Sequence, residues 1–142
     1  LNVPPRVNRP LEPLDPLIYL ITAALGFSAA ENCLFLLSSV DESLVSGILT
    51  GNLRFIGASL LHVLSSGVLG LFMALAFYKG RTAKIIYSIL GILSAIVLHS
   101  LFNYFIIKSQ SGGTLIVFSI VWTLVIFLLV AFEKIKGIKK TK

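Results

Sequence analysis

Three ionisable side chains lie well inside long apolar segments of this 142-residue chain: Glu31, His62 and His99. Such groups are costly in a bilayer interior unless they are paired, hydrated or neutral, so their presence there points to a functional site. A carboxylate can take a proton from water, and an imidazole can shuttle a proton or donate to a developing oxyanion. With the amide of Asn103 as a further oxyanion donor, these residues contain the groups needed to hydrolyse a peptide bond.

The same side chains permit a second chemistry, in which a metal ion activates the water. Glu31, His62 and His99 would supply one carboxylate and two imidazoles, which can hold Zn²⁺ and leave a position open for water. The sequence contains neither the H-E-x-x-H motif of conventional zinc proteases nor the G-x-S-x-G elbow of serine hydrolases. A metal-free site, which needs no cofactor, and a Zn²⁺ site therefore stay as alternatives.

The composition places most of the chain in lipid. Hydrophobic residues make up 56% of the sequence and charged residues 13%, about half the charged share of an average soluble domain. The mean hydropathy is +0.96. The basic residues behind the net charge of +6 lie at the ends of the apolar runs, which is typical of membrane topology and not of a nucleic-acid groove. We expect a bilayer and no nucleic acid as partner, and the single cysteine, Cys33, excludes a disulfide framework.

The apolar runs predict an all-α, polytopic membrane protein with about four transmembrane helices. We expect a cytoplasmic loop over residues 1–15, a helical bundle over 16–133 and a basic cytoplasmic tail over 134–142. Asp15 and Pro16 suit an N-cap and a first helical position. The segment 40–53 is predicted to be a loop or an interfacial helix. The predicted spans, each near the ~20 residues that cross a bilayer, are about 16–37, 54–78, 84–107 and 114–132.

Basic residues orient these spans. Ten of the twelve Lys and Arg residues lie in three regions, 1–15, 79–84 and 134–142, which fall on the same side of the membrane. By the positive-inside rule that side is cytoplasmic, so both ends of the chain are expected there. Counted from that side at about 1.5 Å per residue, Glu31 and His99 lie roughly 22 Å deep and His62 roughly 24 Å deep. The predicted site therefore opens toward the extracytoplasmic side.

Polar and small residues accompany the three ionisable side chains. Asn32 follows Glu31, and Asn103 lies one turn after His99 on the same helix face. Arg54 precedes His62 by two turns and is either a supporting site residue or a snorkelling anchor. Taken singly, the asparagines and histidines could be structural hydrogen-bonding groups between helices, but together they favour a site. Small residues predicted to let neighbouring helices approach closely are Gly26, Ala29, Ala30, Ser65, Gly67 and Gly70.

The order of several short motifs resembles the PrsW family of intramembrane proteases, over roughly residues 11–105. The resemblance rests on E-P-L-D at 12–15, Ile18-Tyr19, G-F-S-A-A-E-N at 26–32, then Arg54, His62, a small-residue face and H-x-x-x-N at 99–103. That family is distantly similar to the CAAX-processing and bacteriocin-processing membrane peptidases.

The resemblance implies an extracytoplasmic-facing peptidase of the bacterial inner membrane that acts on membrane-anchored proteins. The family is linked to site-1 cleavage of anti-sigma factors during envelope stress. In such proteins a glutamate is thought to activate water while His and Asn aid the oxyanion, which implies catalytic Glu31, His62, His99 and Asn103; a metal mechanism is the alternative.

The sequence departs from the family at one motif. An E-E-x-x-K pair of glutamates normally precedes the E-P-L-D loop, and this sequence has no counterpart. Because the chain begins without Met just before that loop, we expect the missing motif upstream and expect these 142 residues alone to be inactive.

Two further functions are compatible with the same residues. A proton- or ion-coupled transporter would use them as a relay or ion site, but it should show an internal repeat, and none is evident. A non-catalytic protein that binds membrane partners would tolerate alanine at Glu31 and His99, whereas a peptidase would not.

Overall fold

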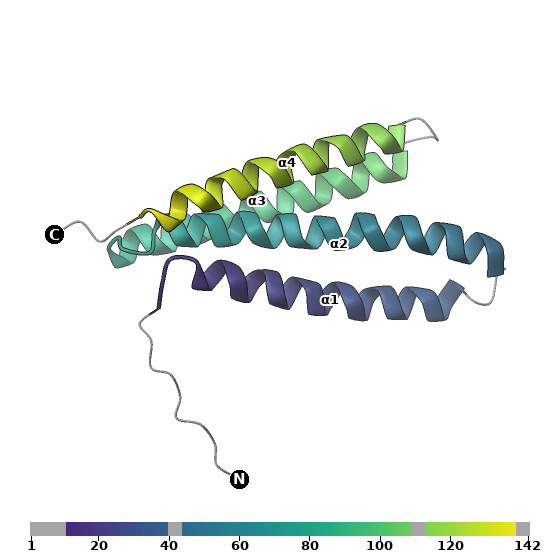
Figure 1. The fold of residues 1–142 in the computed structure, drawn as a ribbon, viewed down its shortest axis with the longest axis horizontal. Helices are drawn as coiled ribbons and strands as arrows, with labels where there is room; N and C mark the ends of the chain where they lie inside the picture. Colours follow the sequence, from purple (N-terminus) through teal and green to yellow (C-terminus); the bar gives the residue numbers. More distant parts are fainter. Residues whose placement is uncertain (1–10, 40–43, 109–112, 139–142) are drawn as a thin grey trace, which may run out of the picture.

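The computed structural model describes residues 11–39, 44–108 and 113–138, and these residues form helices without any strand (Figure 1). Each helix is long and apolar enough to cross a membrane. The predicted all-α fold with four such helices is therefore confirmed. The helices are α1 (Asp15–Ser39), α2 (Leu44–Leu75), α3 (Arg81–Lys108) and α4 (Gly113–Lys136).

Helix α2 is the central element of the bundle. It packs against α1, α3 and α4, and α3 also packs against α4. Successive helices run in opposite directions, so the start of α1, the turn between α2 and α3, and the end of α4 lie together at the left of Figure 1. This arrangement lets side chains of α2 reach α1 on one flank and α3 on another.

The helix starts differ from the predicted span boundaries in informative ways. The Asp15 carboxylate accepts a hydrogen bond from the backbone N–H of Glu12 at 2.7 Å. The contact reaches back three residues, like the backward contact of a capping box, and Asp15 is here the first residue of α1. Helix α2 begins at Leu44, so residues 44–53 are helical. At 1.5 Å per residue its 32 residues span about 48 Å, longer than the ~30 Å hydrocarbon core.

Two glycines of α2 permit close helix packing, as predicted. A Cβ added to Gly70 would lie 2.8 Å from the Leu17 Cα of α1, and one added to Gly67 would lie 2.5 Å from Leu128 of α4. The prediction for Gly26 is wrong, because an added Cβ there meets nothing within 4 Å.

The face of α1 that is buried differs from the face predicted from the sequence. Ala29 and Ala30 are exposed, like Gly26. The small-residue face predicted beside Glu31 therefore points away from α2. Among the described side chains of α1, the buried ones are Asp15, Leu17, Ala24, Ser28 and Asn32.

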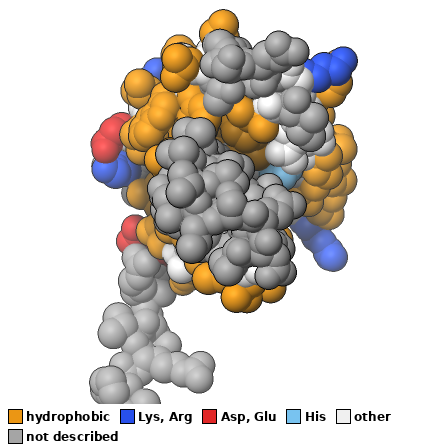
Figure 2. Space-filling view, turned by 90° about the vertical axis from the view of Figure 1, so that its right-hand side faces the viewer, with side chains coloured by type: hydrophobic (Ala, Val, Ile, Leu, Met, Phe, Trp, Pro, Cys, Tyr) orange, Lys and Arg blue, Asp and Glu red, His pale blue; other side chains and the backbone are white. Residues whose placement is uncertain are grey.

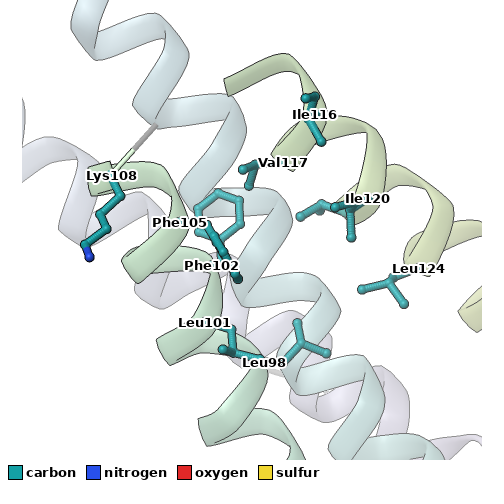
Figure 3. Close-up of a pocket in the computed structure, with 10 residues that line it drawn as sticks. Leu98, Leu101, Phe102, Phe105, Lys108, Ile116, Val117, Ile120 and Leu124 are labelled. Carbon is teal, nitrogen blue, oxygen red and sulfur yellow. The ribbon is translucent and has the colours of Figure 1, made fainter. Parts of the chain in front are cut away.

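Outside these contacts the bundle presents apolar side chains to its surroundings, as a lipid-facing surface should. Figure 2 shows hydrophobic side chains over much of the visible surface, viewed from the end where α1 ends. A groove of about 440 Å³ between α3 and α4 is lined by apolar residues such as Leu101 and Ile120, with Lys108 at one end (Figure 3). The groove contains none of the predicted site residues, so its chemistry is that of a lipid-facing surface.

Candidate functional site

Glu31 of α1 and His62 of α2 form a direct pair inside the bundle. Their Oε2 and Nε2 atoms lie 2.8 Å apart, within hydrogen-bond distance. The His62 side chain is 14% exposed and that of Glu31 38% exposed, so the imidazole is the more enclosed partner. A bond of this kind needs one proton between the two atoms, carried by Nε2 when the carboxylate is ionised. The pair therefore combines a proton acceptor and a proton carrier at one point.

The antiparallel packing of α1 and α2 explains how the two side chains meet. Ser28 and Ser59 lie opposite each other across the interface, with their Oγ atoms 2.7 Å apart. Glu31 and His62 each lie three residues beyond the serine of their own helix, so their Cα atoms are offset along the bundle by about 9 Å. Helical side chains lean toward the N-terminus of their helix. In this antiparallel pair they therefore lean toward one another and close the gap.

His99 of α3 joins the pair from the other flank of α2. Its ring centroid lies 5.3 Å from that of His62, with the ring planes tilted by 52°. The edge of Phe27 from α1 approaches His62 at the same centroid distance, with an interplanar angle of 71°. His62 thus contacts an aromatic ring of α1 and a second imidazole, which can carry a proton.

The predicted site residues divide into two groups in the structure. Glu31, His62 and His99 come together from three helices. Asn103 is exposed on α3, one turn past His99, and no described contact joins it to the other three. Arg54 lies in α2, and its side chain falls outside the described part of the structure.

Asn32 occupies a different place from Glu31, although the two are adjacent in sequence. Its side chain is buried at 6% exposure, and its Nδ2 donates to Ser28 Oγ at 3.4 Å and to Ser59 Oγ at 3.3 Å. The two serines were not singled out from the sequence. The available signal was spacing, because Ser28 and Asn32 are four residues apart and share one helix face.

The three side chains have atoms that can bind a metal ion, but they are not positioned as a metal site. One carboxylate and two imidazoles are suitable Zn²⁺ ligands. Within the described residues, however, no group of three His, Cys, Asp or Glu side chains is placed to hold a metal ion. Glu31 Oε2 and His62 Nε2 are directed at each other and not at a shared third point. The predicted metal set of Glu31, His62 and His99 would therefore need a different arrangement of these side chains.

The site lies toward one end of the bundle. Glu31 is three residues from the end of its candidate membrane span, Asp15–Leu34, and His62 is six residues from the start of its span, Ile56–Leu75. The cations Lys79, Arg81 and Lys136 lie at the opposite end, where α2 ends, α3 begins and α4 ends. A histidine side chain is visible from the site end in Figure 2. The polar site and the basic cluster are thus well separated along the bundle axis.

Comparison with known proteins gives the family of the chain. The model of a family described as PrsW family intramembrane metalloprotease matches residues 6–131, which include every predicted site residue. No curated protein and no solved structure matches the chain. With four helices able to cross a membrane, the chain is an integral, multi-pass membrane protein. It belongs to the PrsW family of intramembrane proteases.

Proposed function

We propose that this protein hydrolyses peptide bonds of membrane-anchored proteins near the extracytoplasmic face, with Glu31, His62 and His99 as its site. The observation that carries the proposal is the 2.8 Å contact between Glu31 and His62 within the bundle, with the His99 ring beside it. Ionisable pairs of this kind within membrane-spanning helices are costly and are retained for function. Membership of a protease family supports hydrolysis over transport.

In the proposed reaction the Glu31–His62 pair acts as general base. It takes a proton from water, and the water oxygen bonds to the scissile carbonyl carbon. His99 donates a hydrogen bond to the oxyanion that forms. The proton then passes from the pair to the amide nitrogen as the C–N bond breaks, which yields a carboxylic acid and an amine. Phe27 packs against the His62 ring and helps to hold it in place.

The location of the site supports the extracytoplasmic assignment. The basic cluster at the opposite end is the pattern of a cytoplasmic boundary, so we place both chain ends in the cytoplasm. The sequence resemblance supports the bacterial inner membrane as location and site-1 cleavage of an anti-sigma factor as role. A single-span protein with a cleavable segment just outside the membrane is the corresponding substrate.

The test is cleavage of a single-span reporter in proteoliposomes by the full-length protein, because residues 1–142 alone are expected to be inactive. We expect the wild type to cut the reporter near its extracytoplasmic end and His62→Ala to lose this activity. Mass spectrometry of the fragments gives the cleaved bond. A folded wild type that leaves the reporter intact, or a His62→Ala variant that cuts equally well, would contradict the proposal.

Metal dependence separates two versions of the mechanism. The direct bond between Glu31 and His62 supports a metal-free base, whereas the description of the family supports a metal ion. We propose the metal-free version and expect cleavage to survive a membrane-permeant chelator unchanged. Loss of cleavage with the chelator, restored by added Zn²⁺, would replace it with a site in which the three side chains rearrange around an ion.

His99 and Asn103 should differ in their effect on rate. His99 lies against His62, so His99→Ala removes the proposed oxyanion donor, and we expect kcat to fall roughly 10²–10³-fold. Asn103 is exposed, and we expect Asn103→Ala to have a clearly smaller effect. Steady-state kcat and KM on the reporter measure both. Equal losses would mean that Asn103 reaches the reacting atoms when substrate is bound.

A further inference from the structure

We propose that Ser28, Ser59 and Asn32 form a register clamp that holds α1 on α2 at the one position where Glu31 meets His62. The three side chains bond across the interface, with Oγ atoms 2.7 Å apart and the Asn32 amide donating to both. No described contact joins them to the proposed reacting groups, and their role is to position Glu31. This inference rests on the proposed function for its effect on activity, although its geometric part is independent.

The clamp pairs the Asn32 amide donors with the two serine oxygens. The Asn32 side chain has two N–H donors, and each points to a different serine oxygen. Ser28 is 2% exposed and Asn32 6% exposed, so water cannot easily replace these bonds. Losing one partner would leave a buried polar atom unsatisfied, which costs more than the bond itself contributes. The three side chains therefore favour one relative position of the helices strongly over neighbouring ones.

Apolar packing alone defines the register of α1 on α2 less strictly than the hydrogen bonds of the clamp do. In lipid, helices gain little from the hydrophobic effect, and association depends on close packing and hydrogen bonds. Another close contact of α1 with α2 is Leu17 against Gly70, eleven residues before Ser28 on α1 and eleven residues after Ser59 on α2. Both contacts fit one antiparallel register, and the clamp is the one nearer to the site.

The catalytic pair is sensitive to this register. The Cα atoms of Glu31 and His62 are offset by about 9 Å along the axis, and the two side chains span that offset by leaning toward each other. A slip by one helical turn would change the offset by about 5.4 Å, far more than a hydrogen bond tolerates. Smaller shifts also matter, because a misplacement of about 1 Å can reduce a catalysed rate on the order of a hundredfold.

The first test measures position without using activity. The ring nitrogens of His62 and His99 in ¹⁵N-histidine-labelled protein give separate NMR signals, which His99→Gln assigns. We expect Ser59→Ala to move the His62 signal in the same direction as Glu31→Gln, because both weaken the Glu31 bond. The matched control is Ser119→Ala, since Ser119 is exposed on α4 and bonds only within its own helix, to the Leu115 carbonyl. A His62 signal unchanged by Ser59→Ala would overturn the clamp whatever the protein's activity.

The second test replaces the clamp by a covalent bond. In a Cys33→Ser background, the pair Ser28→Cys and Ser59→Cys places two thiols where the Oγ atoms lie 2.7 Å apart. We expect the reduced form to cleave the reporter on the order of tenfold more slowly than wild type, and oxidation to the disulfide to restore the rate. A disulfide that forms without restoring the rate would overturn the positioning role. Complete inactivity of the wild type would instead count against the proposed function and leave the NMR result to decide the clamp.

Discussion

Replacing Glu31 by Gln is expected to lower kcat for reporter cleavage by roughly 10²–10⁴-fold, the usual contribution of a general base. The amide has nearly the shape of the carboxylate and can still hydrogen-bond to His62, so the helices should remain in place. What it cannot do is accept a proton from water. The loss should therefore appear in kcat, with KM little changed. Single-turnover cleavage in proteoliposomes, which separates the chemical step from product release, measures it.

The matched control for this change is Glu133→Gln. Glu133 lies in the last part of α4, at the opposite end of the bundle, where its carboxylate forms an exposed ion pair with Lys136. Exposed pairs of this kind contribute little to stability. Cleavage by Glu133→Gln should match the wild type. An equal loss in both variants would show that the effect of Glu31→Gln comes from a general change of charge or insertion, and not from the site.

Gly70→Ala is expected to destabilise the bundle by about 1–3 kcal/mol, the usual cost of overpacking. The added Cβ would lie 2.8 Å from the Cα of Leu17, and a backbone atom cannot move aside as a side chain can. Helix α1 must then shift away from α2, which also disturbs the contact between Glu31 and His62. The intrinsic helix preference for Ala over Gly recovers at most about 1 kcal/mol. Thermal unfolding in detergent should show a lower Tm, together with reduced cleavage.

Gly26→Ala provides the comparison, because it makes the same chemical change in the helix that packs against Gly70. Nothing lies within 4 Å of a Cβ added there. We expect its Tm to equal or exceed that of the wild type, since only the helix preference changes. If Gly26→Ala were the more damaging substitution, the face of α1 that packs in the bundle would be the one first predicted from the sequence, and the described interface would be wrong.

Several features were predictable because the membrane imposes strong physical constraints. Long apolar runs must form helices whose backbone groups are satisfied internally, so the four helices follow from composition and spacing. Ionisable residues inside such runs are too costly to be incidental, so Glu31, His62 and His99 stood out. Equal counts from the basic ends of the spans placed them at one depth, and the structure brings them together.

The face of α1 that packs against α2 was not predictable in the same way. Helix α1 is apolar around most of its circumference, so no periodic pattern separates its buried and exposed sides. Small residues occur on both sides, at Gly26 on one and at Ala24 and Ser28 on the other. The choice depends on the partner surface, where Gly70 and Ser59 accept Leu17 and Ser28. That information belongs to the interface and not to either helix alone.

The direct bond between Glu31 and His62 could also not be predicted by counting residues along each span to estimate depth. Equal depth would suggest that the two Cα atoms lie level, whereas the register set by Ser28 and Ser59 offsets them. The side chains meet because each leans toward its own helix N-terminus in an antiparallel pair. A one-residue difference in register would change this geometry, and the sequence contains no direct measure of register.

The most direct test of the central claim, that Glu31 and His62 act as one catalytic unit, is a double-mutant cycle on reporter cleavage. Glu31→Gln, His62→Gln and the double variant are compared with wild type in the same proteoliposomes, with folding checked by thermal unfolding. Residues that act as a unit are strongly non-additive, so the double variant should be no slower than the slower single variant. If the two losses instead multiply, or if either single variant keeps the wild-type rate, Glu31 and His62 do not form the site proposed for this protein.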